Sequence, residues 1–439
     1  MSPARGSGRN TFLWPWRERR DGAARGRLLF VACLLLICGT TAFIGIVPTQ
    51  IFGHDDFFWL ANAWRTVCGQ RPHLDFYSPW GPVMYLVVGL GMALSNASPN
   101  AIGYGSAIFG LLTGLWGYGL GRDRLETAWR VLFGLYLALL VTAPYALGTR
   151  PTWSTHAMVH NRYSFALVGL VLMECLQRLK GRDENAGEFW GGVSTGAAMA
   201  VALFLKASYF FVTLPIVGAS LVLRGLNRRR LGGLAAGFGV VALALLAYVS
   251  FDVVRFVQDL RMAAAGRSMA MSPWDLADIL RSQVPSLAVV IALYLYGSPT
   301  QKEKGRWLEE QELLIWGLLV FLADAMLIFS NMQARGMPLL GVFGCGGSGI
   351  RSRAESASVG GTKPGEIQCA APGSDDSVRW RIRQARQRRS LHGPHQRRNR
   401  AVEAALRAGR PGAQYGHGES IPVRSGMAAA ARGHGRRRL

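Results

Sequence analysis

The sequence carries little charge for its length. Only 17% of its 439 residues are Asp, Glu, Lys or Arg, against about 25% in a typical soluble domain. Residues 81–121 and 131–149 contain no charged residue at all. A helix of a soluble protein needs a polar face, and these stretches have none. The deficit excludes a soluble enzyme for most of the chain, and the high apolar content excludes disorder for residues 28–345.

The sequence also lacks the cysteine spacings of disulfide-rich and metal-binding proteins. None of its six cysteines belongs to a CxxC motif or a His/Cys cluster, and Cys33, Cys38 and Cys175 fall inside apolar stretches. A disulfide framework and a structural zinc site are therefore not predicted. No P-loop or dinucleotide-binding glycine motif follows a strand-like segment, which excludes the common nucleotide-binding folds.

Long apolar runs are what the sequence does contain. A helix crosses the hydrocarbon core of a membrane with about 20 residues, and these runs show no β-barrel alternation. The predicted fold is therefore all-α, a polytopic transmembrane helical bundle of about nine or ten spans. The first run is an anchor rather than a cleaved signal. The best predicted spans are 28–48, 101–120, 131–149, 162–178, 231–251 and 312–333, and the shorter ones are 81–97, 190–205, 208–223 and 283–298.

Lys and Arg orient this bundle. The positive-inside rule places the basic N-terminus, residues 1–27, and the basic connection at 224–230 in the cytoplasm. The loops at 49–80, 150–161 and 252–282 then lie outside. The first and last of these are rich in aromatic or apolar residues and are predicted to form amphipathic segments along the membrane surface. The expected alternation of cytoplasmic and outer loops fails once. Either 81–97 is a re-entrant or interfacial segment, or the basic loop at 122–130 breaks the rule.

Residues 346–439 differ sharply from the rest. They hold 19 Lys and Arg, only 6 Asp and Glu, and no Phe. A segment with so few apolar residues is predicted to be disordered. Its arginine runs could bind anionic lipid or nucleic acid. The favoured interpretation is a wrong-frame translation of GC-rich DNA, because Gly, Ala, Pro and Arg dominate it. The alternation of cytoplasmic and outer loops places the start of this tail outside the cytoplasm. No nucleic-acid partner is therefore predicted.

Two adjacent carboxylates, Asp55 and Asp56, follow the first apolar run directly and precede Phe57-Phe58-Trp59. This position desolvates them in part, which raises a carboxylate pKa and suits a general base. The alternative is a polar loop start that ends a helix. A carboxylate pair can also hold a divalent cation, so the sequence fixes no cofactor and leaves a cation open.

The segment that follows makes the pattern more specific. Gly69-Gln70-Arg71-Pro72-His73-Leu74-Asp75-Phe76 is followed by Gly81-Pro82, which opens the next apolar run. An acidic pair outside the first span, then a Gly-x-x-Pro-aromatic-x-Asp-Phe box and a Gly-Pro, resembles the GT-C glycosyltransferases. The most similar branch is the mannosyl- and arabinosyltransferase-like group that uses polyprenyl-phosphate sugars. One departure is His73, where the family has an aromatic residue, mostly Tyr.

The resemblance implies a function. Such enzymes of the bacterial inner membrane or endoplasmic reticulum move a hexose or pentose from a polyprenyl phosphate to a glycan, lipid or protein acceptor outside the cytoplasm. The resemblance makes Asp55 or Asp56 the base, and gives Asp75 a structural or donor-site role near His73. We therefore expect a multi-pass glycosyltransferase of the cell envelope, in a bacterial inner (plasma) membrane, with a cytoplasmic N-terminus.

Basic and acidic residues inside the spans suggest further contacts. Arg162 could bind a phosphate with its bidentate fork, and Lys206, at a helix break where the family often has Lys, could meet the same phosphate or snorkel to the interface. Asp324 needs a partner that the sequence does not name, and Glu174 is expected to snorkel at the cytoplasmic end. Lys206 and Asp324 would also suit a transporter or lipid-carrier flippase, although no inverted repeat of interrupted helices supports it. A non-catalytic scaffold is the third alternative.

Overall fold

The computed structural model describes residues 20–150, 152–176, 184–265, 307–330 and 336–346, with single positions between 274 and 291. Within these ranges every regular element is a helix, and no β-strand is present. The predicted all-α fold is therefore confirmed. The segment after residue 346 and most of the predicted span at 283–298 lie outside the described residues.

Most predicted spans correspond to helices. The anchor predicted at 28–48 overlaps α1 (Arg20–Ile44) up to residue 44, and 101–120 matches α4 (Ala101–Leu120). The other matches are α5 (Thr127–Thr142), α6 (Val159–Cys175), α7 (Glu184–Leu205), α8 (Ala207–Arg224), α9 (Arg228–Tyr248) and α12 (Trp307–Ser330). Three described helices are long and apolar enough to cross a membrane, in α1, α7 and α9.

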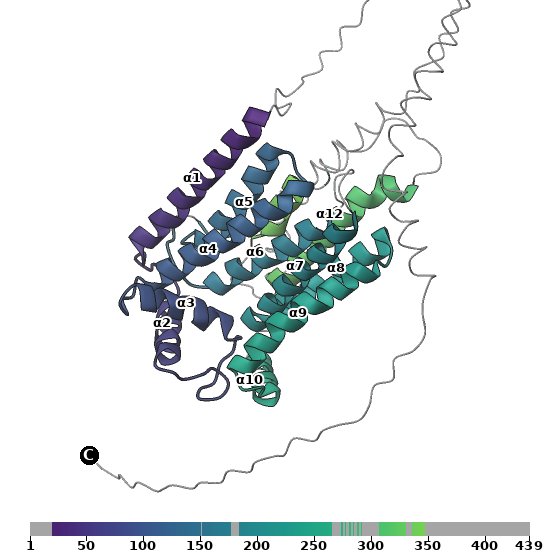
Figure 1. Ribbon diagram of the computed structural model, residues 1–439. Coiled ribbons are helices and arrows are strands. Elements are labelled where there is room, and N and C mark those ends of the chain that lie inside the picture. The colour runs from purple at the N-terminus through teal and green to yellow at the C-terminus, as the bar shows by residue number, and fades with distance from the viewer. Residues whose placement is uncertain are drawn as a thin grey trace, which may run out of the picture. The chain divides into compact units, whose positions relative to one another are not determined.

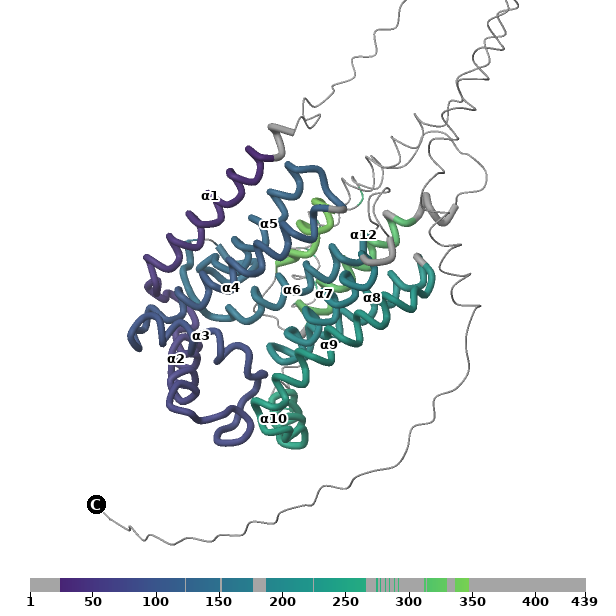
Figure 2. The backbone as a smooth tube through the Cα atoms, in the orientation of Figure 1, coloured from purple at the N-terminus to yellow at the C-terminus, as the bar shows by residue number. Residues whose placement is uncertain are grey.

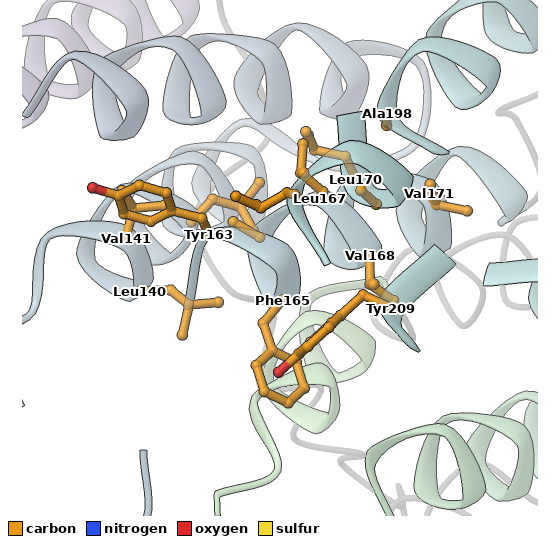
Figure 3. Close-up of a cluster of buried hydrophobic side chains, with 14 of the residues drawn as sticks. Leu140, Val141, Tyr163, Phe165, Leu167, Val168, Leu170, Val171, Ala198 and Tyr209 are labelled. Carbon is orange, nitrogen blue, oxygen red and sulfur yellow. The ribbon is translucent and has the colours of Figure 1, made fainter. Parts of the chain in front are cut away.

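Helix α6 forms the centre of the bundle (Figure 1). All 17 of its residues are buried. Side chains of α5, α7 and α8 pack against those of α6 (Figure 3). The rings of Phe165 in α6 and Tyr209 in α8 meet edge to face, with 4.9 Å between their centroids. Because α6 is enclosed on all sides, the residues of its first turn are held inside the protein.

Helices α7 and α9 pack closely because glycines line their contact. A Cβ on Gly196 would lie 2.1 Å from the Leu234 carbonyl oxygen, and one on Gly237 would lie 2.1 Å from that of Val193. Only a residue without a side chain permits this approach, as is common between membrane helices. The glycine-rich stretch at 192–196 is thus a packing surface, as the sequence suggested.

Short helices gather at one end of the bundle (Figures 1 and 2). They are α2 (Gly53–Val67), α3 (Val83–Leu94) and α10 (Val253–Ala265). The described parts of the segments predicted to be amphipathic, 49–80 and 252–282, therefore contain the helices α2 and α10, which lie at the same end of the bundle (Figure 1). At about 1.5 Å per residue, the 12 residues of α3 reach roughly 18 Å, well short of a bilayer core. This length favours the re-entrant or interfacial alternative for 81–97.

The connections at the opposite end are joined by buried charges. Glu174 is enclosed, and its Oε1 lies 2.7 Å from Nη2 of Arg124, which follows α4. Nη2 of Arg230 donates to the Glu174 carbonyl oxygen at 3.0 Å. The expectation that Glu174 snorkels to the surface is wrong, because its carboxylate is buried and paired with Arg124, and Arg230 holds its backbone carbonyl.

Asp324 in α12 also has a structural partner. The Leu339 backbone N–H lies 3.4 Å from its Oδ1, at the start of a short helix over residues 338–346. A carboxylate in this position caps the helix. The same helix is held from the other side by Tyr136, whose hydroxyl donates to the Pro338 carbonyl oxygen at 2.7 Å. Asp324 therefore fixes a helix within the bundle.

Candidate active site

Two helices of the site begin after a strained residue. Phe52 precedes α2 with a φ of 57°, and Met158 precedes α6 with a φ of 57°. Large side chains rarely adopt this left-handed region, and strain of this kind concentrates at functional sites. The paired strain marks the junction of α2 and α6 as the first place to look for chemistry.

The two loops that lead into these helices are joined by hydrogen bonds. The Gln50 N–H donates to the Ser154 carbonyl oxygen at 3.0 Å, and the Thr155 hydroxyl donates to the Ile51 carbonyl oxygen at 2.8 Å. The Val47 N–H donates to Nε2 of His156 at 3.1 Å. The segment after α1 and the segment before α6 therefore form one unit, which brings the predicted residues of the two outer loops together.

Asp55 lies in the first turn of α2 and is half-buried. The Met158 N–H donates to its Oδ2 at 3.3 Å, and Nε2 of the exposed His54 lies 3.1 Å from its Oδ1. Burial raises the pKa of Asp55, while His54 and the Met158 N–H act to lower it. Both of its oxygens thus have partners, and the carboxylate ties α2 to α6.

Asp56 is the more enclosed of the pair, with 4% of its surface exposed. Its Oδ2 accepts a hydrogen bond from the Thr49 hydroxyl. Its Oδ1 is buried and has no hydrogen-bond partner among the described residues. Burial and the neighbouring Asp55 raise the pKa of Asp56, against the lowering effect of Thr49 and Arg162. A buried carboxylate oxygen that accepts no hydrogen bond can take up a proton.

Arg162 approaches this pair from α6. It is almost fully buried, and its Nη1 donates to the Tyr145 carbonyl oxygen. Its Nε has no hydrogen-bond partner among the described residues. The structure therefore brings three sequence-predicted residues, Asp55, Asp56 and Arg162, to one place.

His156 completes this group. Because its Nε2 accepts the Val47 N–H, the neutral ring carries its proton on Nδ1. Burial and the charge of Arg162 lower the pKa of His156 to about 3. The side chain is therefore a neutral imidazole over the whole physiological range, and cannot act as a cation.

An apolar cavity of about 840 Å³ adjoins His156. It lies between the second half of α1, the end of α5 and residues 336–338. Its walls are mostly aliphatic, and among the described residues that line it His156 alone has a nitrogen-containing side chain. Nη1 of Arg162 donates a hydrogen bond to the carbonyl of Tyr145, a lining residue. The guanidinium that acts on Asp56 therefore also contacts the cavity wall.

Lys206 lies deeper, at the break between α7 and α8. Its Nζ is 2.7 Å from Oδ1 of Asn161, and both side chains are buried. The Asn161 Nδ2 has no hydrogen-bond partner among the described residues. Lys206 therefore points toward the first turn of α6, next to Arg162, and the snorkelling alternative is wrong.

His73 and Asp75 lie apart from the carboxylate pair. Nδ1 of His73 is 2.8 Å from Oδ2 of Asp259 in α10, and the Ser78 N–H donates to the same oxygen at 3.1 Å. Burial lowers the pKa of His73, although Asp259 acts to raise it. The exposed Asp75 accepts the Arg71 N–H at 2.6 Å. The contacts of His73 and Ser78 fasten the loop before α3 to α10, and the Asp75 contact lies within that loop.

Several contacts around the site were not predicted from the sequence. Trp59, Trp80 and His160 form a ring cluster with centroids 4.6 to 5.2 Å apart, directly beside the site. Asp259 and the Asn161 contact depend on pairings across many residues, which no local pattern reveals. Among the described residues, no three His, Cys, Asp or Glu side chains come together as a metal site.

Comparisons with known proteins are few. No family model and no curated protein match the chain. Two similar solved structures are crystal structures of ArnT from Cupriavidus metallidurans. The one bound to undecaprenyl phosphate is 18% identical over 74% of this chain, with a TM-score of 0.44. The apo form is 16% identical over 76%, with a TM-score of 0.42. Both matches cover 59% of the ArnT chain, so this chain spans less than two thirds of it.

Proposed function

We propose that this protein is a membrane glycosyltransferase of the GT-C type, which takes a sugar from a polyprenyl-phosphate donor and transfers it to an acceptor at the extracytoplasmic face. The observation that carries the proposal is the carboxylate pair of half-buried Asp55 and buried Asp56, under the electrostatic influence of the buried Arg162 and near an apolar cavity. The motif around Asp55, Asp56 and residues 69–82 supports the same class.

Asp56 is the proposed base. Its Oδ1 takes the proton of the acceptor hydroxyl, whose oxygen attacks the anomeric carbon of the sugar. The bond from that carbon to the phosphate oxygen breaks, and the phosphate leaves with the electron pair. Attack opposite the leaving group inverts the anomeric centre. Asp55 assists as the second carboxylate, because two neighbouring carboxylates titrate as a coupled pair.

The basic residues serve the donor. Arg162 offers a buried guanidinium with one N–H that has no partner among the described residues, and such a fork suits phosphate. Lys206 lies at the break between α7 and α8 and contacts Asn161, the residue before Arg162 in α6. Its ammonium supports the negative charge of the leaving phosphate. His73 and Asp75 contribute by shaping the loop before α3, which we place near the donor.

The depth of the site suits a lipid-linked donor. The chain of a polyprenyl phosphate is anchored in the hydrocarbon, so the reacting carbon lies near the membrane surface. The carboxylate pair follows α1 directly, and α1 is long and apolar enough to cross the membrane. The cavity beside it is wide and aliphatic, which suits an isoprenoid chain. The bilayer proposed is a bacterial inner membrane.

The transporter alternative has lost its supporting observation. It relied on Lys206 and Asp324 as parts of a polar path. Lys206 contacts Asn161, and Asp324 caps the helix over 338–346. No feature of the described residues favours translocation over transfer.

The experiment is a transfer assay with membranes that contain the full chain. Radiolabelled polyprenyl-phosphate mannose and polyprenyl-phosphate arabinose are offered in turn, and label in membrane acceptors is measured. Transfer from one donor, with product of opposite anomeric configuration, is expected. The proposal would be contradicted if no sugar were transferred from either donor, or if the product kept the anomeric configuration of the donor.

A further inference from the structure

The cavity has one polar corner. Five of its lining residues carry hydroxyls, and three of these already donate to backbone carbonyls: Thr41 to Ile37 at 2.9 Å, Thr142 to Ala138 at 2.9 Å and Tyr136 to Pro338 at 2.7 Å. The rest of the wall is mostly aliphatic. Among the described lining residues, His156 is therefore the one side chain that offers a nitrogen donor to a mostly apolar cavity.

The orientation of the His156 ring is fixed. The Val47 N–H occupies Nε2 at 3.1 Å, so Nδ1 must carry the proton. Nδ1 donates to no other described residue, and it is not among the buried side-chain atoms that lack a partner. The proton of Nδ1 is thus accessible, on a ring that lines the cavity.

A positive charge lies behind this corner. Nη1 of the buried Arg162 holds the carbonyl of Tyr145, which lines the same cavity. An N–H donor backed by a guanidinium favours an oxygen that carries negative charge. The aliphatic walls exclude a small hydrophilic anion as the sole occupant and favour a long hydrocarbon chain with one anionic end.

We propose that His156 is a headgroup ligand: its Nδ1–H donates a hydrogen bond to a phosphate oxygen of a polyprenyl phosphate whose chain fills the cavity. The inference rests on the proposed function for the class of lipid, and it names His156 as the residue that binds the phosphate. Because burial beside Arg162 keeps the pKa of His156 near 3, this contact does not depend on protonation of the ring at physiological pH.

The two nitrogens of His156 can be tested separately. The amide of Asn reaches the place of Nδ1, whereas the amide of Gln reaches the place of Nε2. His156→Asn therefore keeps a donor toward the cavity and loses the acceptor for Val47. His156→Gln keeps the acceptor for Val47 and loses the donor. Binding to the purified full chain is measured for undecaprenyl phosphate, undecaprenol and inorganic phosphate, with thermal unfolding of each variant recorded.

We expect the wild type to bind undecaprenyl phosphate at least about tenfold more tightly than undecaprenol, as one hydrogen bond to a charged group provides. His156→Asn should keep this preference and His156→Gln should lose it. Equal affinity of the wild type for both lipids would overturn the proposal. So would a preference kept by His156→Gln, or lost in both variants when their unfolding is normal. Binding of inorganic phosphate as tight as that of the lipid would assign the corner to free phosphate instead.

A second variant leaves His156 untouched. Ala143 lines the cavity, and Ala143→Trp should fill it and abolish binding of both lipids. Binding that survives Ala143→Trp would overturn the assignment of the chain to this cavity. The measurement needs no sugar transfer. If the lipid binds as expected and no transfer occurs, the proposed function fails while this inference stands.

Discussion

The ammonium of Lys206 lies 2.7 Å from the amide oxygen of Asn161, deep inside the bundle. Lys206 lies at the break between the end of α7 and the start of α8, and Asn161 belongs to the first turn of α6. The contact therefore links a helix break to the helix that carries Arg162. A buried charge held in this way is costly to separate from its partner.

Loss of this contact should destabilise the protein. Asn161→Leu leaves the Lys206 ammonium with fewer acceptors in a buried place, and we expect a loss of about 1.5–3 kcal/mol. Lys206→Met removes the charged group itself. The double variant should therefore lose less stability than the two single variants together. Thermal unfolding in detergent measures the cycle. Additive losses would show that the two side chains do not interact.

Asp56 should make stability depend on pH. Its pKa is raised in the folded protein, so the native state holds the proton more tightly than the unfolded chain. Stability is then highest at low pH and falls as pH rises from about 4 through the raised pKa. Asp56→Asn cannot titrate and still offers an oxygen to Thr49. Its melting temperature should match that of the wild type in acid and exceed it at neutral pH. A uniform destabilisation at every pH would contradict the burial of a charged Asp56.

Two glycines of α9 should respond in opposite ways. Gly237→Ala places a Cβ 2.1 Å from the Val193 carbonyl oxygen and should force α7 and α9 apart, at a cost of roughly 1–3 kcal/mol. Gly239 has nothing within 4 Å, so Gly239→Ala should be neutral or stabilising by up to about 1 kcal/mol. Thermal unfolding of both variants is the measurement. Equal effects would mean that the close helix contact is not present.

Cys68 reports on the side of the membrane. It is exposed just after α2, and we predict that the loop at 49–80 lies outside. In a variant that keeps Cys68 as its only cysteine, an impermeant maleimide should label intact cells. A variant whose single thiol is Arg228→Cys should be labelled only after permeabilisation. The reverse pattern would invert the proposed topology.

Local sequence predicted the helices well because apolar runs and their charged ends are local features. It also predicted Asp55, Asp56 and Arg162 as residues of interest, and the fold brings them together through the joined loops that precede α2 and α6. It did not predict the contact between His73 and Asp259, which lie 186 residues apart. The partners of Glu174 and Asp324 were missed for the same reason, since packing of distant helices decides which buried charges meet. The length of α3 favours one of the two alternatives that the loop charges had left open for 81–97.

The most direct test of the account is the transfer rate of Asp56→Asn. Membranes with matched amounts of wild type, Asp55→Asn, Asp56→Asn and a control are compared for transfer from a polyprenyl-phosphate sugar. The control is Asp252→Asn, at a partly exposed aspartate that pairs with Arg255 away from the site. Removing a positioned base lowers a rate by about a hundred- to ten-thousand-fold. We expect a loss of that size in Asp56→Asn, a smaller loss in Asp55→Asn and none in Asp252→Asn. Near-normal transfer by both Asp55→Asn and Asp56→Asn would show that the buried carboxylates are structural and that the proposed chemistry is wrong.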